Sequence, residues 1–475
     1  MKISPIKSSG NFKGLVIIPF FEIEESDQAI SVESFSISKN LFLGKKDSQF
    51  IFEDKNSDRV FLLVGLGKEP SYKTIKTAFR RLTAKQESVF EKKVLVWLND
   101  KMDSDCLEAA VSGLLLGTYR LGHYKQTDKA PKNWSKVSIS ILSENKESKK
   151  TIEKGLKIAA AQIETFNLVD LPPNKVTPKY LADWASDAGK KFGFDVKVLD
   201  RKKAEKENLK AFLAVGQGSH REPQFIIMKY RSKSAKMHIG LVGKGVTFDT
   251  GGLNIKTMGM VHMKCDMGGA AAVLGAMQLI ADLQLQVNIT AIVPCVENAV
   301  DSHSFLPSDV IGSYSGKTIE IIDTDAEGRL ILADGLSYLI QNFKPDTVID
   351  FATLTGSAVG TFGSECAALF SKNEELSKNL QLSGEKIGER LWPLPMWDEY
   401  KSEMDSEIAD IKNFHGKPYA GAITAAKFLE FFTENHSSWA HIDIAGTAFG
   451  DSEFAKTKHA TAYGVHLLIK LIENL

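Results

Sequence analysis

Four carboxylates and three basic side chains stand in two short, glycine-rich blocks near the middle of the chain. The first block spans residues 242–269 and the second spans residues 323–330. Together they hold Lys244, Asp249, Lys256, Asp266, Asp325, Glu327 and Arg329. Carboxylate oxygens are hard ligands, and two divalent ions a few Å apart need several of them, some bridging. The two blocks therefore predict a polynuclear metal site.

The basic residues of the two blocks fit such a site in different ways. Lys244 can bind a metal ion only when neutral, which requires a pKa drop of more than about three units, roughly 5 kcal/mol. An adjacent divalent cation can supply that drop. Lys256 and Arg329 are suited to remain as fixed positive charges that face a developing oxyanion. Glycines let the backbone approach such a site closely, here at positions 243, 245, 251, 252, 268, 269 and 328.

Each of these residues also has a simpler interpretation. Asp266 could cap a helix predicted over 268–283, and Asp325 could cap the helix that begins near Glu327. Lys244 alone would be an ordinary loop lysine, and its surroundings lack the glycine and hydroxyl residue of a phosphate-binding loop. The combination of seven residues in two blocks, rather than any single one, favours the metal site.

The two blocks also resemble known signatures. Residues 243–252 read Gly-Lys-Gly-Val-Thr-Phe-Asp-Thr-Gly-Gly, and residues 324–330 read Thr-Asp-Ala-Glu-Gly-Arg-Leu. These motifs are similar to those of the leucyl (cytosol) aminopeptidase family, called aminopeptidase A in bacteria. Further similarity covers the carboxyl half, at 214–219, 293–298, 352–356 and 439–446. The amino-terminal part matches only loosely, chiefly at 63–67.

The resemblance implies a site with two divalent ions, zinc or manganese. It places Lys244, Asp249, Asp266 and Glu327 around one ion and Asp249, Asp325 and Glu327 around the other. Asp249 and Glu327 would then bridge the pair. By the same resemblance, a metal-bridging water attacks the peptide carbonyl after the first residue, and the free α-amine binds one metal.

The resemblance also implies roles for the remaining side chains. Lys256 would polarise the carbonyl and stabilise the tetrahedral intermediate, and Arg329 would hold a bicarbonate ion that acts as general base. Asp323 stands where the family commonly has Asn, but the ligands themselves are intact. The residues implied to line the substrate cleft are Met263, Thr353, Leu354, Gly356, Ala445 and Ala448. A small residue at 448 widens the first pocket, which predicts a preference for Leu, Met and other apolar first residues.

A chain of 475 residues is too long for a single core and should divide into domains. We expect an α/β protein with a smaller amino-terminal α/β domain over 1–145, a linker helix over 146–170 and a larger catalytic domain over 171–475. In the first domain, apolar runs indicate buried strands that alternate with helical patterns. The expected strands are 15–18, 60–64, 94–98 and 137–142, and the expected helices are 72–90 and 106–124.

The second domain is predicted to be doubly wound around a mixed, mostly parallel sheet. Its strand candidates are 196–199, 212–215, 225–228, 239–242, 289–293, 319–322, 348–351 and 441–444. Helices are expected between several of them, notably over 268–283 and 329–342. Ligands of such sheets bind at the carboxyl ends of the strands. We expect loops at 244–249 and 323–327 to lie at those ends.

Composition limits the possible partners. The 59 basic and 59 acidic residues give a net charge of zero, which offers no electrostatic argument for nucleic acid or an anionic membrane. Four scattered cysteines indicate reduced thiols and, with no apolar run of membrane-spanning length, a cytoplasmic protein. The resemblance implies peptide substrates with free N-termini and a homo-hexamer whose active sites face an inner cavity.

Three other functions stay open at this stage. Some bacterial relatives bind DNA as architectural or regulatory proteins, although zero net charge argues against this as the main role. A catalytically inactive relative is a second possibility, against which the intact motifs count. A dipeptidase acting on cysteinylglycine would be a narrower variant of the same chemistry.

Overall fold

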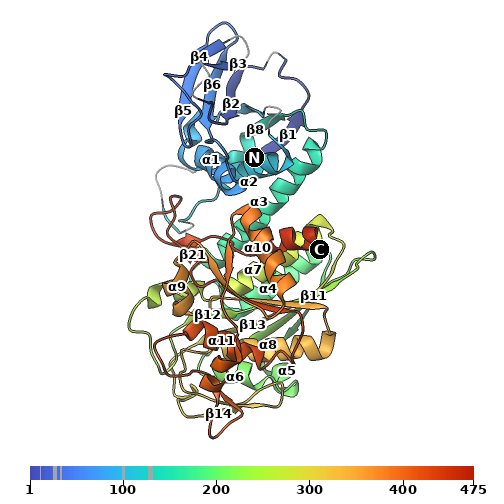
Figure 1. Cartoon of the computed structure of the whole chain (residues 1–475), viewed down its shortest axis with the longest axis vertical. Helices are drawn as coiled ribbons and strands as arrows, with labels where there is room; N and C mark the ends of the chain where they lie inside the picture. Colours follow the sequence, from blue (N-terminus) through green and yellow to red (C-terminus); the bar gives the residue numbers. More distant parts are fainter. Residues whose placement is uncertain (11, 25–28, 33–34, 99–101, 123, 127–131) are drawn as a thin grey trace. The chain divides into compact units, whose positions relative to one another are not determined.

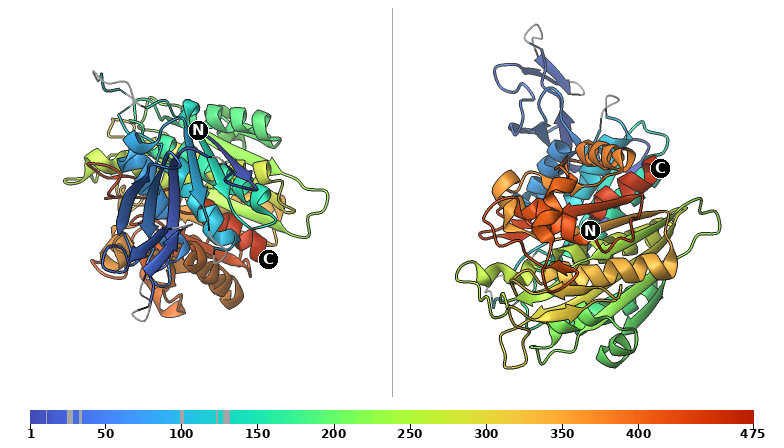
Figure 2. Two further views of the ribbon diagram at one scale, coloured as in Figure 1. Left: turned by 90° about the horizontal axis from the view of Figure 1, so that it is seen from above. Right: turned by 60° about the horizontal axis from the view of Figure 1, so that its bottom comes forward.

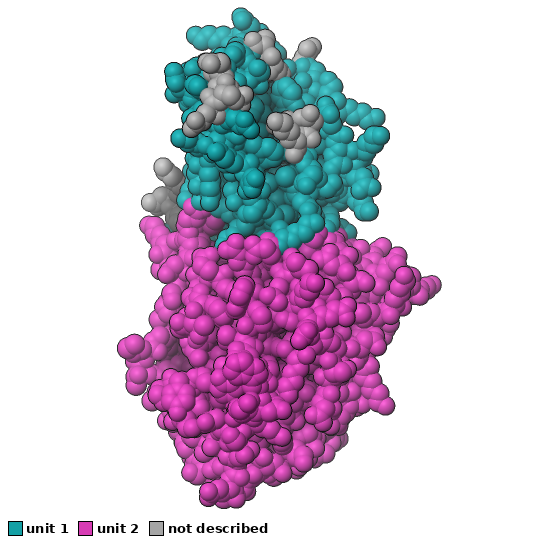
Figure 3. Space-filling model, viewed as in Figure 1, with its two compact units in different colours: residues 1–163, 386–388 teal, residues 164–385, 389–475 magenta. Residues whose placement is uncertain are grey.

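The computed structural model describes residues 1–475 apart from positions 11, 25–28, 33–34, 99–101, 123 and 127–131. The chain forms two compact units (Figure 3). Unit 1 comprises residues 1–163 and 386–388, and unit 2 comprises residues 164–385 and 389–475. The division falls within helix α3 (Ser148–Asp170), in the range predicted as a linker helix. The predicted α/β architecture of two domains is confirmed.

Unit 1 is built on a six-stranded sheet in the order β1-β8-β7-β2-β6-β5 (Figure 1). Neighbouring strands are parallel except β5 and β6, which are antiparallel. The strands are β1 (Lys2–Ile6), β2 (Gly14–Phe20), β5 (Gln49–Asp54), β6 (Arg59–Gly65), β7 (Lys93–Trp97) and β8 (Ser138–Leu142). A separate hairpin pairs β3 (Ala29–Val32) with β4 (Phe35–Ser38). All four strands predicted for this region are present.

The two predicted helices of unit 1 are present but shorter than expected. Helix α1 (Tyr72–Lys85) stops where Gln86 leaves the helical conformation, and a short 3-10 turn over Glu87–Val89 follows. Helix α2 (Ser104–Leu116) begins after the N-cap Asp103 and ends before Gly117. Of the rest of the range predicted as helix, position 123 lies outside the described residues.

Unit 2 contains a nine-stranded sheet whose main path runs β18-β17-β20-β16-β11-β13-β10-β9, with β12 also paired to β13. The central pairs are parallel, namely β20–β16, β16–β11, β11–β13 and β12–β13. Strand β10 runs antiparallel to both of its neighbours, β13 and β9. The strands are β9 (Asp195–Leu199), β10 (Gln224–Tyr230), β11 (His238–Gly243), β12 (Gly245–Asp249), β13 (Asn288–Asn298), β16 (Thr347–Ala352), β17 (Ala367–Phe370), β18 (Leu391–Pro393) and β20 (Trp439–Asp443). The sheet is therefore mixed and mostly parallel, as predicted.

Helices cover both faces of this sheet (Figure 2). A Cβ atom on Gly240 would meet Leu339 of α8 (Gly328–Phe343), whereas one on Gly243 would meet Gly269 and Ala270 of α7 (Gly268–Leu283). Positions of opposite parity along β11 thus face the two helices from opposite sides, as a doubly wound sheet requires. On these two faces lie α4 (Pro178–Phe192) and α12 (Val465–Asn474) with α7, and α6 (Lys210–Gly216) and α11 (Gly421–Glu430) with α8.

Two local predictions, at 212–215 and 244–249, are wrong, and the strand predicted at 319–322 is present in part but lies in another sheet. Residues 212–215 form part of α6 rather than a strand, because a short apolar run has no periodicity that separates a buried strand from a buried helix. The run at 319–322 contributes β15 (Thr318–Glu320) to a small separate sheet with β14 (Val310–Gly312) and β19 (Ile411–Lys412). The predicted loop at 244–249 is largely strand β12.

The structure bears on two further expectations. No helix in the described part of the chain is long and apolar enough to cross a lipid bilayer. Each of the four cysteines, at positions 106, 265, 295 and 366, is a free thiol.

Candidate functional site

The first block of the candidate site is placed by strands β11 and β12. Lys244 follows β11 directly, and its backbone N–H donates to the carbonyl of Phe351 on the neighbouring strand β16, at 3.0 Å. Asp249 ends β12, where it lies in register with Asn298 of β13. Both side chains are buried, with Lys244 3% exposed and Asp249 2% exposed. Strands β11 and β12 pair one after the other along the same neighbour, β13, so Lys244 lies at the carboxyl end of β11 and Asp249 at the carboxyl end of β12.

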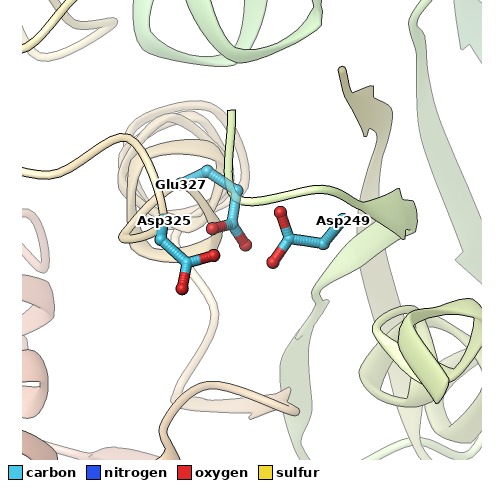
Figure 4. A group of neighbouring side chains, drawn as sticks. All are labelled: Asp249, Asp325 and Glu327. Carbon is cyan, nitrogen blue, oxygen red and sulfur yellow. The ribbon is translucent and has the colours of Figure 1, made fainter. Parts of the chain in front are cut away.

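The second block comes from a different sheet. Asp325 and Glu327 lie between β15 of the small sheet and the first turn of α8. Their carboxylates and that of Asp249 point toward one another (Figure 4), and one oxygen of each lies within 4.8 Å of the others. The Asp325 side chain is 34% exposed, whereas Glu327 is 1% exposed. Residues that are about 75 positions apart in the chain thus form one cluster.

Hydrogen bonds between the two blocks hold this cluster together. The Thr324 hydroxyl donates to the carbonyl of Gly251 at 2.7 Å, and the Asn254 side chain accepts the Thr324 N–H at 2.9 Å. The Asn298 amide donates to Asp249 Oδ1 at 2.8 Å and to the carbonyl of Thr324 at 3.1 Å. Asn298 therefore orients one carboxylate while it anchors the loop that carries the other two.

The two lysines lie between the carboxylates. Lys244 Nζ is 2.8 Å from Asp266 Oδ1 and 3.1 Å from Glu327 Oε1. Lys256 Nζ is 2.8 Å from Asp249 Oδ2 and also contacts Asp325 Oδ1. Burial by itself lowers the pKa of both lysines, but the surrounding carboxylates outweigh it and raise each pKa above its ordinary value.

The pKa values of three carboxylates are also raised, which in their case favours the neutral form. Burial, followed by repulsion from Glu327 and Asp249, raises the pKa of Asp325 to about 7. Burial also raises the pKa of Glu327 and, well above its usual range, that of Asp266. Negative charges packed this closely in a desolvated pocket are unfavourable unless cations lie among them.

Asp266 and Asp325 do not act as helix caps. The N-cap of α7 is Met267 and that of α8 is Glu327, and neither helix has a side-chain cap bond. Instead, Asp266 Oδ1 accepts hydrogen bonds from Lys244 Nζ at 2.8 Å and from the Thr353 hydroxyl at 2.9 Å. The simpler interpretation of both aspartates is therefore excluded.

Unused acceptor atoms show that the cluster fits metal ions. Asp266 Oδ2 and Glu327 Oε2 are buried and accept no hydrogen bond from any residue that the structure describes. A buried carboxylate oxygen without a donor is costly, and a divalent cation would satisfy it. Glu327 is one of the three convergent carboxylates, and Asp266 is linked to it through Lys244 Nζ, so the residues present suit a site for more than one cation.

Arg329 is held beside the cluster by a residue that the sequence did not indicate. Its Nη1 donates to the backbone carbonyl of Asn413 at 2.7 Å, while its Nε is buried without a partner among the described residues. Burial lowers the pKa of Arg329 to about 10. The Asn413 side chain accepts the Ile322 N–H at 2.8 Å and donates to the carbonyl of Asp323 at 2.6 Å. Asn413 thus fixes both the guanidinium and the loop before Asp325.

An open cavity of about 1070 Å³ surrounds these groups. Twelve of the thirteen residues predicted for the metal, catalytic and substrate sites line it, namely Lys244, Asp249, Lys256, Met263, Asp266, Asp325, Glu327, Arg329, Thr353, Leu354, Gly356 and Ala445. Ala448 is buried and is not among its lining residues, so the structure does not place it against a first side chain as expected.

A single buried aspartate organises the part of the wall expected to bind substrate. Asp443 accepts hydrogen bonds from the N–H groups of Leu354 and Ala445, both at 3.1 Å, and from the Thr355 hydroxyl at 2.7 Å. The Thr353 carbonyl in turn accepts from Lys244 Nζ at 2.9 Å. This wall is therefore tied directly to the charged cluster.

Replacement of Gly328 by alanine is expected to reduce activity at least tenfold with little change in melting temperature. A Cβ atom at this position would lie 2.4 Å from Cε and 2.6 Å from Nζ of Lys244. The end of a lysine side chain can move aside, so the methyl group displaces the ammonium and leaves the backbone in place. Activity assays and thermal unfolding of the purified variant measure the two effects.

Gly269→Ala provides the contrasting variant. A Cβ atom there would lie 2.0 Å from the backbone carbonyl oxygen of Phe351, which cannot move without shifting strand β16. Overpacking of this kind costs about 3 kcal/mol, so a clear drop in melting temperature is expected. Equal thermal destabilisation by the two substitutions would contradict this account of Gly328.

The sequence did not identify the residues that orient the proposed metal ligands without binding an ion themselves. Asn298, Thr324 and Asn413 hold the cluster through amide and hydroxyl groups. Asn298 follows Glu297 directly at the carboxyl end of strand β13, and a polar pair at that end of a mainly apolar strand was a usable signal. Asn413 had none, because it approaches Arg329 from 84 positions away in the chain.

Comparisons with known proteins agree over most of the chain. The family model described as "Cytosol aminopeptidase family, catalytic domain" matches residues 164–469. A second model, "Cytosol aminopeptidase family, N-terminal domain", matches residues 36–128.

Individual relatives give the same result. A probable cytosol aminopeptidase of Chlorobaculum tepidum is 43% identical over 375 residues, which cover 77% of this chain and 74% of the relative. One from Protochlamydia amoebophila is 36% identical, with 97% of this chain and 96% of the relative covered. Among solved structures, the bottromycin maturation enzyme BotP in complex with Mn superposes with a TM-score of 0.86 at 27% identity, with 97% and 99% of the two chains covered.

Proposed function

Because this chain belongs to the cytosol aminopeptidase family, a family of metal-dependent peptidases, we propose that it removes single residues from the N-termini of peptides with two divalent ions in its cavity. The observation that carries the proposal is the convergence of the carboxylates of Asp249, Asp325 and Glu327, of which Glu327 has a buried oxygen without a donor among the described residues. Manganese and zinc are the candidate ions. Manganese is the ion named for the solved structure of BotP.

Five residues would hold the ions. Lys244, Asp249, Asp266, Asp325 and Glu327 all line the cavity and lie within one network of contacts. When bound, such ions supply a water nucleophile at neutral pH and polarise the peptide carbonyl. The protein contributes the shape of the cavity and the fixed positions of the carboxylates.

Lys256 and Arg329 would serve the reaction as positive charges. The Lys256 side chain is 17% exposed, so its ammonium faces the cavity and can donate to an oxygen that gains negative charge. Arg329 has a buried Nε without a partner among the described residues, which leaves it a donor for an anion in the cavity. We propose bicarbonate as that anion, with the role of accepting a proton.

The proposed substrates are peptides with an unblocked, apolar first residue. Met263, Leu354 and Ala445 give the cavity an apolar wall, next to Thr353 and Gly356. We propose Leu and Met as preferred first residues. This preference rests on these wall residues and not on Ala448, which does not line the cavity.

Removal of metal is expected to abolish leucine release from leucine anilide, and addition of manganese or zinc to restore it. The proposed nucleophile is a water molecule activated by the bound ions, so hydrolysis should stop when they are removed. Chelator-treated protein would be assayed before and after titration with each ion, with aspartate anilide as a parallel substrate. Activity that survives complete chelation would contradict the proposal, and equal turnover of the two anilides would contradict the apolar preference.

We further propose a cytoplasmic homo-hexamer, as the family resemblance implies, which size measurements in solution would test. The DNA-binding alternative raised by the sequence gains no support from the site or from the relatives compared. Filter binding to duplex DNA at low and moderate salt would test it separately.

A further inference from the structure

The distribution of charge around the cavity is uneven. Four lining residues are cationic, and three of them, Lys244, Lys256 and Arg329, belong to the proposed catalytic site. The fourth is Lys417, on the segment between β19 and α11. Five lining residues are anionic, and all belong to the two metal blocks, namely Asp249, Asp266, Asp323, Asp325 and Glu327. Lys417 is therefore the cation of the described wall that the proposed chemistry does not use.

The surroundings of Lys417 fix its ammonium at the cavity wall. Its Nζ donates to Glu403 Oε1 at 2.7 Å, and Glu403 does not line the cavity. The ammonium also lies 5.9 Å from the ring centroid of Tyr419. Glu403 thus binds the ammonium from outside the set of lining residues, while the Lys417 side chain is 42% exposed. A lysine has three N–H donors, so at least one remains for a group inside the cavity.

The loop that carries Lys417 is anchored on both sides. Before it, the carbonyl of Asn413 accepts from Arg329 Nη1 at 2.7 Å. Around it, the His415 ring bonds to the carbonyl of Tyr419 at 2.7 Å and to the Thr424 hydroxyl at 3.2 Å. These contacts give Lys417 a defined position relative to the proposed catalytic site.

We propose that Lys417 binds the C-terminal carboxylate of a short peptide, so that the protein favours di- and tripeptides with a free C-terminus over their amides. This inference rests on the proposed function. A peptide whose first bond lies at the carboxylate cluster carries its C-terminal carboxylate at a different part of the cavity, and Lys417 is the cationic lining residue that lies outside the proposed catalytic site. Lys417 is the charged group of the described wall that can receive that carboxylate.

The test compares free and amidated substrates of the metal-loaded protein. The ratio of kcat/KM for leucylglycine to that for leucylglycine amide, and the same ratio for leucylglycylglycine, would be measured at low salt. In Lys417→Met the ratio is expected to fall about fivefold for at least one length, which corresponds to the upper range for an exposed ion pair. Lys417→Arg, which keeps the charge, should retain the wild-type ratio within about twofold.

Lys401→Met is the matched control, because Lys401 is an exposed lysine two positions before Glu403 that does not line the cavity. It should leave the ratio unchanged. Wild-type activity with ratios that Lys417→Met does not alter would overturn this inference and leave the aminopeptidase proposal standing. Absence of leucine release from every substrate by the metal-loaded wild type would overturn both.

Discussion

Replacement of Lys256 by methionine is expected to lower kcat for leucine anilide at least a hundredfold while the protein still binds its metal ions. Methionine keeps most of the length of the side chain but removes the ammonium that contacts Asp249 and Asp325. Loss of a single donor to a developing oxyanion costs about 10²–10³ in kcat. Loss of the positive charge also favours cation binding by the same carboxylates.

The measurement has two parts, steady-state kinetics at saturating metal and calorimetric titration of the metal-free variant. Lys378→Met, an exposed lysine on α10 (Glu374–Ile387), is the control for removal of a lysine charge from the same unit. A Lys256→Met variant with near wild-type kcat would exclude the oxyanion role. A variant that fails to bind metal would instead show that Lys256 is required to build the site.

Asp249→Asn is expected to weaken metal binding more than about 100-fold and to abolish leucine release at ordinary metal concentrations. An asparagine can keep the two hydrogen bonds that Asp249 Oδ1 accepts, from Gly251 N–H and from Asn298 Nδ2, each at 2.8 Å. In the wild type, Asp249 Oδ2 lies 2.8 Å from Lys256 Nζ. In the variant, the NH₂ group of the asparagine takes the place of this oxygen and faces the Lys256 ammonium. The fold is retained while the negative charge is lost. Changes to residues that merely orient a ligand cost 10–100-fold in affinity, so loss of a ligand should exceed that range.

Asp323→Asn is the matched control for this substitution. Asp323 also lines the cavity, but it lies outside the carboxylate cluster, and the resembling family commonly has Asn at this position. The control removes the same formal charge and should leave metal affinity and kcat within about threefold. If the two variants lose metal equally, the effect arises from the general charge of the cavity rather than from ligation by Asp249.

The sequence was sufficient to locate the candidate site because carboxylates and lysines that cluster among glycines have few functions other than metal binding. The sequence predicts Asp249, Asp266, Asp325 and Glu327 as one set of ligands, and the carboxylates of Asp249, Asp325 and Glu327 converge. The strands that flank them were predictable for a similar reason. Runs such as 239–242 and 348–351 are buried on both faces, so apolar residues mark them without interruption.

The errors arose where one local pattern fits two structures. The run at 212–215 is apolar and short, and its helical state is fixed by a distant group, since Asp334 accepts the N–H of Phe212 at 2.9 Å. The run at 319–322 does contain part of a strand, but its own residues do not determine which sheet that strand joins. Asn413 could not be identified at all, because its role depends entirely on contacts with Ile322, Asp323 and Arg329.

The proposed metal ligands come from two different sheets, and this arrangement affects how bound ions would stabilise the protein. Asp249 stands at the end of a strand of the nine-stranded sheet, whereas Asp325 and Glu327 follow a strand of the three-stranded sheet. An opening that separated the small sheet alone would disperse the ligands without unfolding the large one. If the proposed ions bind only the closed form, they would add their binding free energy to the junction between the sheets. Their release would then report a local opening of the molecule before its global unfolding.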